Sequence, residues 1–547
     1  MKGGAPAAAP PAHWKLVPAE VAALGPPHRH AILGIALAAC LLRLFFWFYT
    51  DRTWEDALIT VLHSENFARG LGLTHYHPGF GPVHGFTSPL SVLVPLAADI
   101  FHPGWGLPFL KLVSALLSIP TVLLAAAVAL NPTFRMNVWL VYLLCGYLAF
   151  EHHQVLWGMA GMETQMAVFS LFLALYLAGK GRGRALGAAL ALCLYARPDF
   201  AFFVMIVGVY LLVADRAALR QAVPVAAALY APWLVFTTLY YGSPVPNTIV
   251  AKGLGYPLWT RTTACFSRPF WTTVFARVYG YIFLPLGPCF GGHGMGLQTF
   301  LDEALISRLA LLSIAAGSLA MLRDFRKLYL IPLGTMVVYA VYYIFCVHNI
   351  FGWYLVPFSA VNCLLLALGL NALCRAIVRP DRIGLVSRMA CAGYLLPFLA
   401  VLPLTIPAER NIQRYIETPV RVAMGRYLAA HKKPGDRVGC EPLGYVAYYS
   451  RMPVYDYPGL ASPEVTEYLK RFPQHRSLEL MLEHFRPEWI ALRENEYRFM
   501  LGYGDPMKFL ETDYTVEKVF RADPNAGRIL RVENNADRVF YLLRKRS

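Results

Sequence analysis

The sequence predicts a polytopic α-helical membrane protein with a C-terminal α/β or α+β domain outside the membrane. Of its 547 residues, 57% are hydrophobic and only 15% are charged, whereas soluble domains are about half apolar and about a quarter charged. The charged residues are also unevenly placed, since 42 of the 82 lie in residues 407–547. A weakly charged body is therefore followed by a tail with the composition of a soluble domain.

The first membrane helix is predicted over 31–50. Residues 1–30, rich in Ala, Pro and Gly, are expected to be disordered and cytoplasmic, and the first helix is retained because no small-residue cleavage site follows it. Arg43 lies near the end of this run, where we expect its side chain to snorkel toward water. Ten further apolar runs raise the expected number of spans to eleven: 107–130, 137–150, 165–179, 184–197, 199–214, 221–241, 304–322, 328–347, 354–374 and 387–406.

The short run 89–101 is not counted as a span. It holds two prolines and is only about 13 residues long, against about 20 for a spanning helix. If it spanned, every basic cluster between the later helices would lie outside, whereas leaving it out places all of them in the cytoplasm, as the positive-inside rule requires. These clusters are Lys180/Arg182/Arg184, Arg216/Arg220, Arg323/Arg326/Lys327 and Arg375/Arg379/Arg382/Arg388.

The resulting topology divides the chain into a membrane domain, 31–406, and an external domain, 407–547. The outer loops are 51–106, 151–164 and 242–303. Cys265 and Cys289 lie in the third loop, where they either form a disulfide or remain two free thiols. The tail alternates helix-like stretches (421–430, 463–472, 478–485) with strand-like ones (Val438–Gly439, Val454–Tyr455, Trp489–Leu492, Arg538–Leu543), which predicts the α/β or α+β domain.

Polar residues with potential chemistry gather at the outer face. The apolar runs are nearly free of charge, whereas a transporter buries ionisable residues at mid-membrane depth. Glu55 and Asp56 open the first outer loop. Asp56 also fits a capping box with Thr53 as N-cap, so a structural role competes with a catalytic one. His75, His77 and His84 follow in the same loop, but their spacing matches no strong metal-binding pattern.

Several motifs together resemble one enzyme family. Glu55–Ile59, Glu65–Leu73 and His84–Leu90 resemble the first outer loop of bacterial GT-C glycosyltransferases, most similarly the mycobacterial terminal arabinofuranosyltransferase group. Later motifs resemble that group in the same order: Gly161–Thr164, Ala196–Asp199, Tyr240–Thr248 with Ala251–Lys252, and, in the tail, Gly435–Val438, Gly444–Tyr449 and Asp456–Leu460. Glu55 stands where relatives commonly have a second Asp. The resemblance covers most of the chain from about residue 31.

The resemblance implies a transferase that takes a sugar from a polyprenyl monophosphate lipid and passes it to a cell-envelope glycan. A departing phosphate needs a cation, and the acceptor hydroxyl needs a base. We assign the base to Asp56, with Glu55 as its neighbour or as a sugar ligand. Lys252 is the first choice for the phosphate and Arg197 the second.

Other residues are candidates for binding the sugar or the acceptor. They are Glu163, Asn247, Asp199, His84 and Tyr354. Four of them have a structural alternative: a helix cap for Glu163, an Asx turn for Asn247, a turn that pairs its own charges for Asp199 with Arg197, and a membrane-interface anchor for Tyr354 with Trp353. Lys252 has one as well, a solvated loop lysine.

The remaining expectations concern partners and place. No cofactor is required, a divalent metal is allowed but not indicated, and the basic net charge is not attributed to nucleic acid. We expect a bacterial plasma-membrane protein with a cytoplasmic N-terminus. The alternatives are a related transferase that adds mannose or another hexose to protein or lipid, a flippase or transporter of lipid-linked sugars, and a non-catalytic scaffold.

Overall fold

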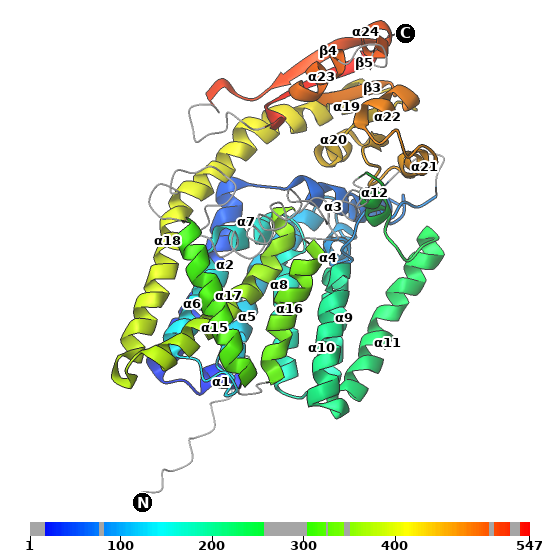
Figure 1. The fold of residues 1–547 in the computed structure, drawn as a ribbon. Coiled ribbons are helices and arrows are strands. Elements are labelled where there is room, and N and C mark those ends of the chain that lie inside the picture. Colours follow the sequence, from blue (N-terminus) through cyan, green and yellow to red (C-terminus); the bar gives the residue numbers. More distant parts are fainter. Residues whose placement is uncertain are drawn as a thin grey trace, which may run out of the picture.

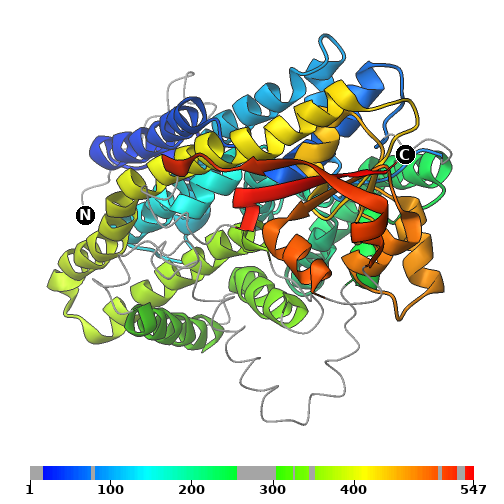
Figure 2. The same ribbon diagram turned by 90° about the horizontal axis from the view of Figure 1, so that it is seen from above.

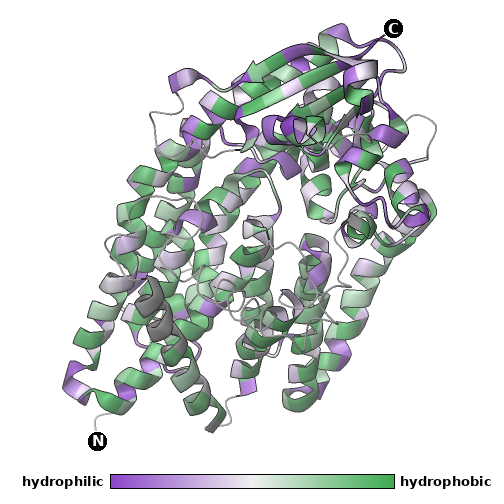
Figure 3. Cartoon of the chain, turned by 45° about the horizontal axis from the view of Figure 1, so that its top comes forward, coloured by the Kyte–Doolittle hydropathy of each residue, from purple (hydrophilic) through white to green (hydrophobic). Residues whose placement is uncertain are grey.

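The computed structural model describes residues 17–75, 81–255, 303–323, 327–343, 351–502, 508–525 and 536–546. It has a helical bundle with a smaller α/β domain at one end (Figure 1). Figure 3 shows that the bundle is largely hydrophobic and that hydrophilic residues are frequent in the domain. Cys265, Cys289 and His77 lie outside the described residues.

The bundle contains the long apolar helices. Among the described residues, five helices are long and apolar enough to cross a membrane, or six if the bent pair α7–α8 is one span. The predicted total of eleven therefore stays a prediction, because several of the expected spans form shorter apolar helices. The bundle elements are α1 (Ala19–Ala22), α2 (Pro26–Thr50), α5 (Gly106–Ala129), α6 (Val138–Phe150), α7 (His152–Met159), α8 (Thr164–Gly179), α9 (Gly183–Ala196), η2 (Pro198–Phe200), α10 (Ala201–Ala214), α11 (Arg216–Tyr241), α15 (Glu303–Arg323), η4 (Lys327–Tyr329), α16 (Leu330–Val341), α17 (Gly352–Ile377), η6 (Pro380–Arg382) and α18 (Ile383–Ile412).

Arg43 corrects one expectation about the first helix. Its side chain is buried rather than directed to water. The guanidinium donates to the backbone oxygens of Leu148 (2.9 Å) and Gln154 (3.3 Å) and to Oε1 of Gln165 (3.1 Å). A buried guanidinium must find acceptors, and here three neighbouring helices supply them. Arg43 thereby ties α2 to α6, α7 and α8.

Three short helices lie between the bundle and the domain. They are α3 (Glu55–Ala68), α4 (Leu90–Asp99) and α12 (Asn247–Gly255) (Figure 1). The run 89–101, left out of the predicted spans, forms the ten-residue α4. It packs beside α3, where Ser64 Oγ donates a 2.5 Å hydrogen bond to Asp99.

The tail domain is built on one mixed sheet. Within the described part of the tail, five strands occur in the order β2-β1-β3-β5-β4, with β1 parallel to β2 and β3 and with β5 antiparallel to β3 and β4. The strands are β1 (Val438–Cys440), β2 (Val454–Asp456), β3 (Trp489–Arg493), β4 (Tyr514–Arg521) and β5 (Val539–Lys545). The helices are α19 (Ala423–His431), α20 (Leu443–Ser450), α21 (Pro463–Arg471), α22 (Leu478–Phe485), α23 (Glu494–Leu501), α24 (Lys508–Asp513) and the short η11 (Ala536–Arg538). Trp489, Phe540 and Leu542 are fully buried in its core.

The predicted border at residue 406/407 falls inside a continuous helical segment. α18 continues without interruption into the π-helical η7 (Gln413–Val422) and then into α19, so one rod of 52 residues, Pro380–His431, joins the bundle to the domain. Pro419 lies inside the π-helical stretch. Figure 2 shows the domain lying across the end of the bundle that this rod reaches.

Candidate functional site

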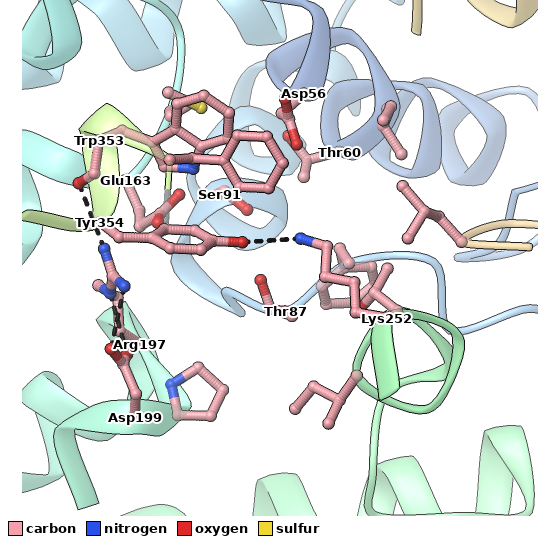
Figure 4. Close-up of a pocket in the computed structure, with 18 of the residues that line it drawn as sticks. Asp56, Thr60, Thr87, Ser91, Glu163, Arg197, Asp199, Lys252, Trp353 and Tyr354 are labelled. Atoms are coloured by element: carbon pink, nitrogen blue, oxygen red, sulfur yellow. Dashed lines mark hydrogen bonds and ion pairs between the residues drawn. The ribbon is translucent and has the colours of Figure 1, made fainter. Parts of the chain in front are cut away.

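A cavity of about 550 Å³ lies between the bundle and the tail domain. Its walls come from α3, the start of α4 and the loop before it, the junctions α7–α8 and α9–α10, α12, the residues after α16, the start of α17 and one residue of the tail domain, Leu460. Figure 4 shows the polar side chains that line it together with the aromatic rings of Trp353 and Tyr354. The labelled lining residues are Asp56, Thr60, Thr87, Ser91, Glu163, Arg197, Asp199, Lys252, Trp353 and Tyr354.

Asp56 is in the first turn of α3 and lines the cavity. The predicted capping box is wrong: the helix begins at Glu55 with Trp54 as N-cap, and Thr53 Oγ1 instead accepts a 3.0 Å hydrogen bond from Lys111 Nζ. Burial raises the pKa of the Asp56 carboxyl, and the positive charge of Lys252 opposes that rise. A carboxylate in such surroundings is a stronger base than one in water.

Lys252 is on α12, and its side chain extends into the cavity (Figure 4). Its Nζ donates a 2.8 Å hydrogen bond to the hydroxyl of Tyr354. The ammonium also lies 5.5 Å from the centroid of the Tyr354 ring and 5.7 Å from that of Phe351. Lys252 is therefore half-buried beside aromatic rings rather than a solvated loop lysine.

Arg197 and Asp199 form a bidentate ion pair at the α9–α10 junction. Arg197 Nε and Nη2 donate to the two carboxylate oxygens of Asp199 at 2.9 and 3.0 Å, and Tyr343 donates to the same carboxylate at 2.9 Å. Arg197 Nη1 also donates to the backbone oxygen of Trp353 at 3.5 Å. The turn thus pairs its own charges, as the structural alternative stated, while both side chains still line the cavity.

Glu163 lines the cavity at the sharp break between α7 and α8, whose axes differ by 114°. It precedes α8 but makes no side-chain cap, so the capping role expected as an alternative is absent. Burial raises the pKa of its carboxyl and the positive charge of Arg197 opposes the rise. Gly161 in the same break has a φ of +90°, and a β-carbon there would press against Ala57 of α3. The break is therefore held close to the helix that carries Asp56.

Three predicted site residues do not line the cavity. Glu55 is turned toward the tail domain, where it pairs with Arg421 and accepts a 3.0 Å hydrogen bond from the backbone N–H of Gly444. Asn247 donates hydrogen bonds from its side-chain amide to the backbone oxygens of Gly459 (2.7 Å) and Leu460 (3.2 Å) in the tail domain.

His84 is the third of these residues. It is buried in an aromatic cluster, where its ring stacks on Tyr241 with centroids 4.4 Å apart. Burial lowers the pKa of His84 to about 3 and that of the neighbouring His63 to about 4, so both rings are neutral at pH 7. Among the described residues, no group of three or more His, Cys, Asp or Glu side chains is arranged to hold a metal ion.

Sequence reasoning did not select the hydroxyl groups of the cavity. Thr60, Thr87 and Ser91 line it together with Asp56, Lys252 and Arg197 (Figure 4). Thr60 and Ser91 donate to backbone oxygens in their own helical turns, at 3.0 and 2.8 Å. Single hydroxyl residues form no spacing pattern that would identify them in a sequence. Thr87 is the exception, because it lies inside the His84–Leu90 motif and could have been chosen as a candidate on that ground.

The comparisons with known proteins bear on the fold. Residues 410–541 match a family described as a domain of unknown function (DUF8728). No curated protein matches the chain. Among solved structures, the oligosaccharyltransferase of Archaeoglobus fulgidus in complex with Zn and sulfate is similar, with a TM-score of 0.50 and 11% identity over 88% of this chain and 71% of that one. The apo form of the same enzyme has a TM-score of 0.50 and 12% identity, over the same shares of the two chains.

ArnT from Cupriavidus metallidurans bound to undecaprenyl phosphate gives a TM-score of 0.49 and 12% identity, over 94% of this chain and 97% of that chain. At these identities the likeness to the archaeal oligosaccharyltransferase concerns the fold alone. It shows that this chain shares the overall fold of that enzyme, and the GT-C assignment stays a prediction. The arabinofuranosyltransferase subgroup stays a prediction.

Proposed function

We propose that the protein is a membrane glycosyltransferase that moves a sugar from a polyprenyl monophosphate to a cell-envelope glycan. The observation that carries the proposal is the presence of Asp56 and Lys252 in one cavity between the membrane bundle and the tail domain. A carboxylate and an ammonium are the two charges that such a transfer needs. The fold shared with an oligosaccharyltransferase supports the proposal at the level of architecture.

In the proposed reaction, Asp56 accepts the proton of the acceptor hydroxyl as that oxygen bonds to the anomeric carbon of the sugar. The bond between this carbon and the phosphate oxygen breaks, and the lipid phosphate leaves with the electron pair. Lys252 stabilises the negative charge that grows on the phosphate. The carboxylate also stabilises the positive charge that develops on the sugar ring.

Lys252 is preferred over Arg197 for the phosphate because of their present partners. Arg197 already meets a full carboxylate in Asp199, so its charge is largely compensated. Lys252 lines the cavity together with Asp56, and its Nζ donates to the Tyr354 hydroxyl, a hydrogen bond that a phosphate oxygen would replace with a stronger, charge-assisted one. We therefore assign Arg197 and Asp199 to shaping the cavity wall beside Tyr354.

The donor sugar and the setting follow from the resemblance rather than from the cavity. An arabinofuranose-like pentose is our first choice, and mannose or another hexose is the alternative. We place the protein in the bacterial plasma membrane with its N-terminus in the cytoplasm, and the outer loops and residues 407–547 on the other side. The basic clusters between the later helices support this orientation.

Substitution of Asp56 tests the proposal. Asp56→Asn keeps the shape of the side chain and removes the base, so transfer from undecaprenyl-phosphate-linked arabinofuranose to acceptor membranes should fall about 10²-fold or more. The control is Asp381→Asn, which makes the same change at an exposed position between α17 and α18. Activity of Asp56→Asn within a few-fold of the parent would refute the assignment of the base.

A liposome assay separates the transferase from the flippase. The purified protein is reconstituted with the labelled lipid-linked sugar and an acceptor glycan. A transferase forms a new glycosidic bond that mass spectrometry detects, whereas a flippase moves the label between leaflets and leaves the sugar on its lipid. Movement without a new bond, for arabinofuranose and mannose donors alike, would contradict the proposed function.

A further inference from the structure

Glu55 precedes Asp56 in the first turn of α3 but takes part in a different set of contacts. One of its carboxylate oxygens pairs with Arg421, and the other accepts the N–H of Gly444 at the start of α20. Gly444 lies so close that a β-carbon there would collide with the backbone oxygen of Glu55. The first turn of α3 is thus packed directly against the tail domain.

Arg421 is near the end of the π-helical η7, and acidic side chains surround it. Besides Glu55, its guanidinium pairs with Glu417 at 2.5 Å and with Asp537 at 3.5 Å. Its side chain is 5% exposed and that of Glu417 is 2% exposed. The guanidinium also lies 4.6 Å from the ring centroid of Tyr445. Such a buried planar cation with several fixed acceptors has little freedom to move.

The residues just before α3 are held by the same rod. Arg52 pairs with Glu409 at 3.0 Å and with Glu417 at 3.1 Å. The backbone N–H of Thr53 donates to Oε1 of Gln413 at 3.2 Å, and its carbonyl accepts from the Tyr445 hydroxyl at 2.7 Å. Glu417 is therefore shared between Arg52, on the chain leading into α3, and Arg421.

We propose that Arg421 is a positioning residue for the reaction, acting through Glu55 to fix the first turn of α3 and with it the carboxylate of Asp56. This inference rests on the proposed function. Arg421 is not among the residues that line the cavity. Its effect on the reaction passes through the orientation of α3, which determines where the Asp56 carboxylate stands.

A displaced base is enough to slow a proton transfer strongly, because geometry errors of about 1 Å cost about 10²-fold in rate. Without Arg421, Glu55 and Glu417 would lose the cation that they share, and the ion pair that holds the Glu55 side chain would be gone. Glu55 would then leave its place beside Gly444, and the first turn of α3 would lose its contact with the tail domain. Lys252 is on α12, which is attached to the tail domain through separate contacts from Asn247 to Gly459 and Leu460, so we expect binding of the lipid phosphate to change little.

The test is a steady-state comparison in the full-length protein, with undecaprenyl-phosphate-linked arabinofuranose as donor. Arg421→Met should lower kcat about 10-fold or more while the donor KM stays within about twofold. Arg421→Lys, which keeps the charge, should recover part of the lost kcat. The control is Arg498→Met, since Arg498 is an exposed arginine of the same domain that pairs with Glu494. It should behave as the parent.

Glu55→Gln provides a second route if Arg421→Met does not accumulate. It removes the charge that meets Arg421 and should reproduce the selective loss of kcat. The positioning role is overturned if both variants keep kcat within twofold, or if KM rises as much as kcat falls. Asp56→Asn is measured alongside: if it too retains activity, the proposed base fails, whereas an inactive Asp56→Asn with a fully active Arg421→Met defeats only the positioning role.

Discussion

The ammonium of Lys252 donates a 2.8 Å hydrogen bond to the hydroxyl of Tyr354, across a cavity that both side chains line. The guanidinium carbon of Arg197 lies 5.2 Å from the centroid of the same tyrosine ring. Tyr354 therefore stands between two cations: Lys252, proposed for the donor phosphate, and Arg197, assigned to the cavity wall. One of these cations is paired with a carboxylate, and the other has a neutral phenol among its partners.

Lys252→Ala should weaken use of the donor. Removing the ammonium takes away the charge that stabilises the leaving phosphate, so kcat/KM for the lipid-linked sugar is expected to fall about 10- to 100-fold. Lys252→Arg should retain more activity because it keeps the charge. Initial rates at limiting donor measure the effect. Lys433→Ala, at an exposed lysine of the tail domain, serves as the control, and an unchanged rate in Lys252→Ala would dismiss the assignment.

Asp199→Asn should destabilise the protein rather than abolish binding of the donor. It leaves the guanidinium of Arg197, which is 7% exposed, without its carboxylate. Breaking a buried pair in this way costs about 3–5 kcal/mol of unfolding free energy. The double variant Arg197→Met/Asp199→Asn removes both charges and should recover much of the loss. Thermal unfolding in detergent measures both, and equal stability of the single variant and the parent would contradict the account.

Glu55 should make stability depend on pH near neutrality. Burial raises the pKa of its carboxyl to about 7, although Arg421 acts against that rise. A carboxyl with a raised pKa binds its proton more tightly in the folded state, so its contribution to stability is present at pH 4 and is lost as the pH rises through 7. The side chain of Glu55→Gln cannot titrate. The melting temperature of this variant, relative to that of the parent, should therefore rise between pH 5 and pH 8. A constant difference across this range would argue against the shifted pKa.

The sequence was sufficient to select most of the charged residues of the cavity. Asp56, Glu163, Arg197 and Lys252 come from segments far apart in the chain, and the fold brings them together. Each stands in a loop or junction at the predicted outer end of the apolar runs. Because membrane helices run between two fixed surfaces, residues at the same ends of such runs meet at the same surface.

The sequence alone does not predict in which direction an individual side chain points. Glu55 and Asp56 are adjacent, but consecutive residues on a helix point about 100° apart, so only one of them faces the cavity. Which one does so depends on Arg421 and Gly444, more than 360 residues away along the chain. The hydrogen-bond partners of Asn247 could not be predicted for a similar reason, because Gly459 and Leu460 belong to the tail domain.

In the tail, four strands lie where the sequence placed them, and β4 was missed. β4 is an edge strand with an irregularity between Val516 and Lys518, and its side chains do not alternate regularly between buried and exposed. Period-two patterns arise when one face of a strand is buried, so a bulged edge strand gives only a weak signal.

The unbroken rod from α18 through η7 to α19 has a consequence for how the two halves of the chain can be inherited. A cut at residue 406 would remove Glu409 and Glu417 and leave Arg52 buried without its carboxylates. The membrane half is then not a self-contained module that gene fusion could exchange. In a protein that carries the membrane half alone, we expect another residue in place of Arg52, or other acidic side chains beside it.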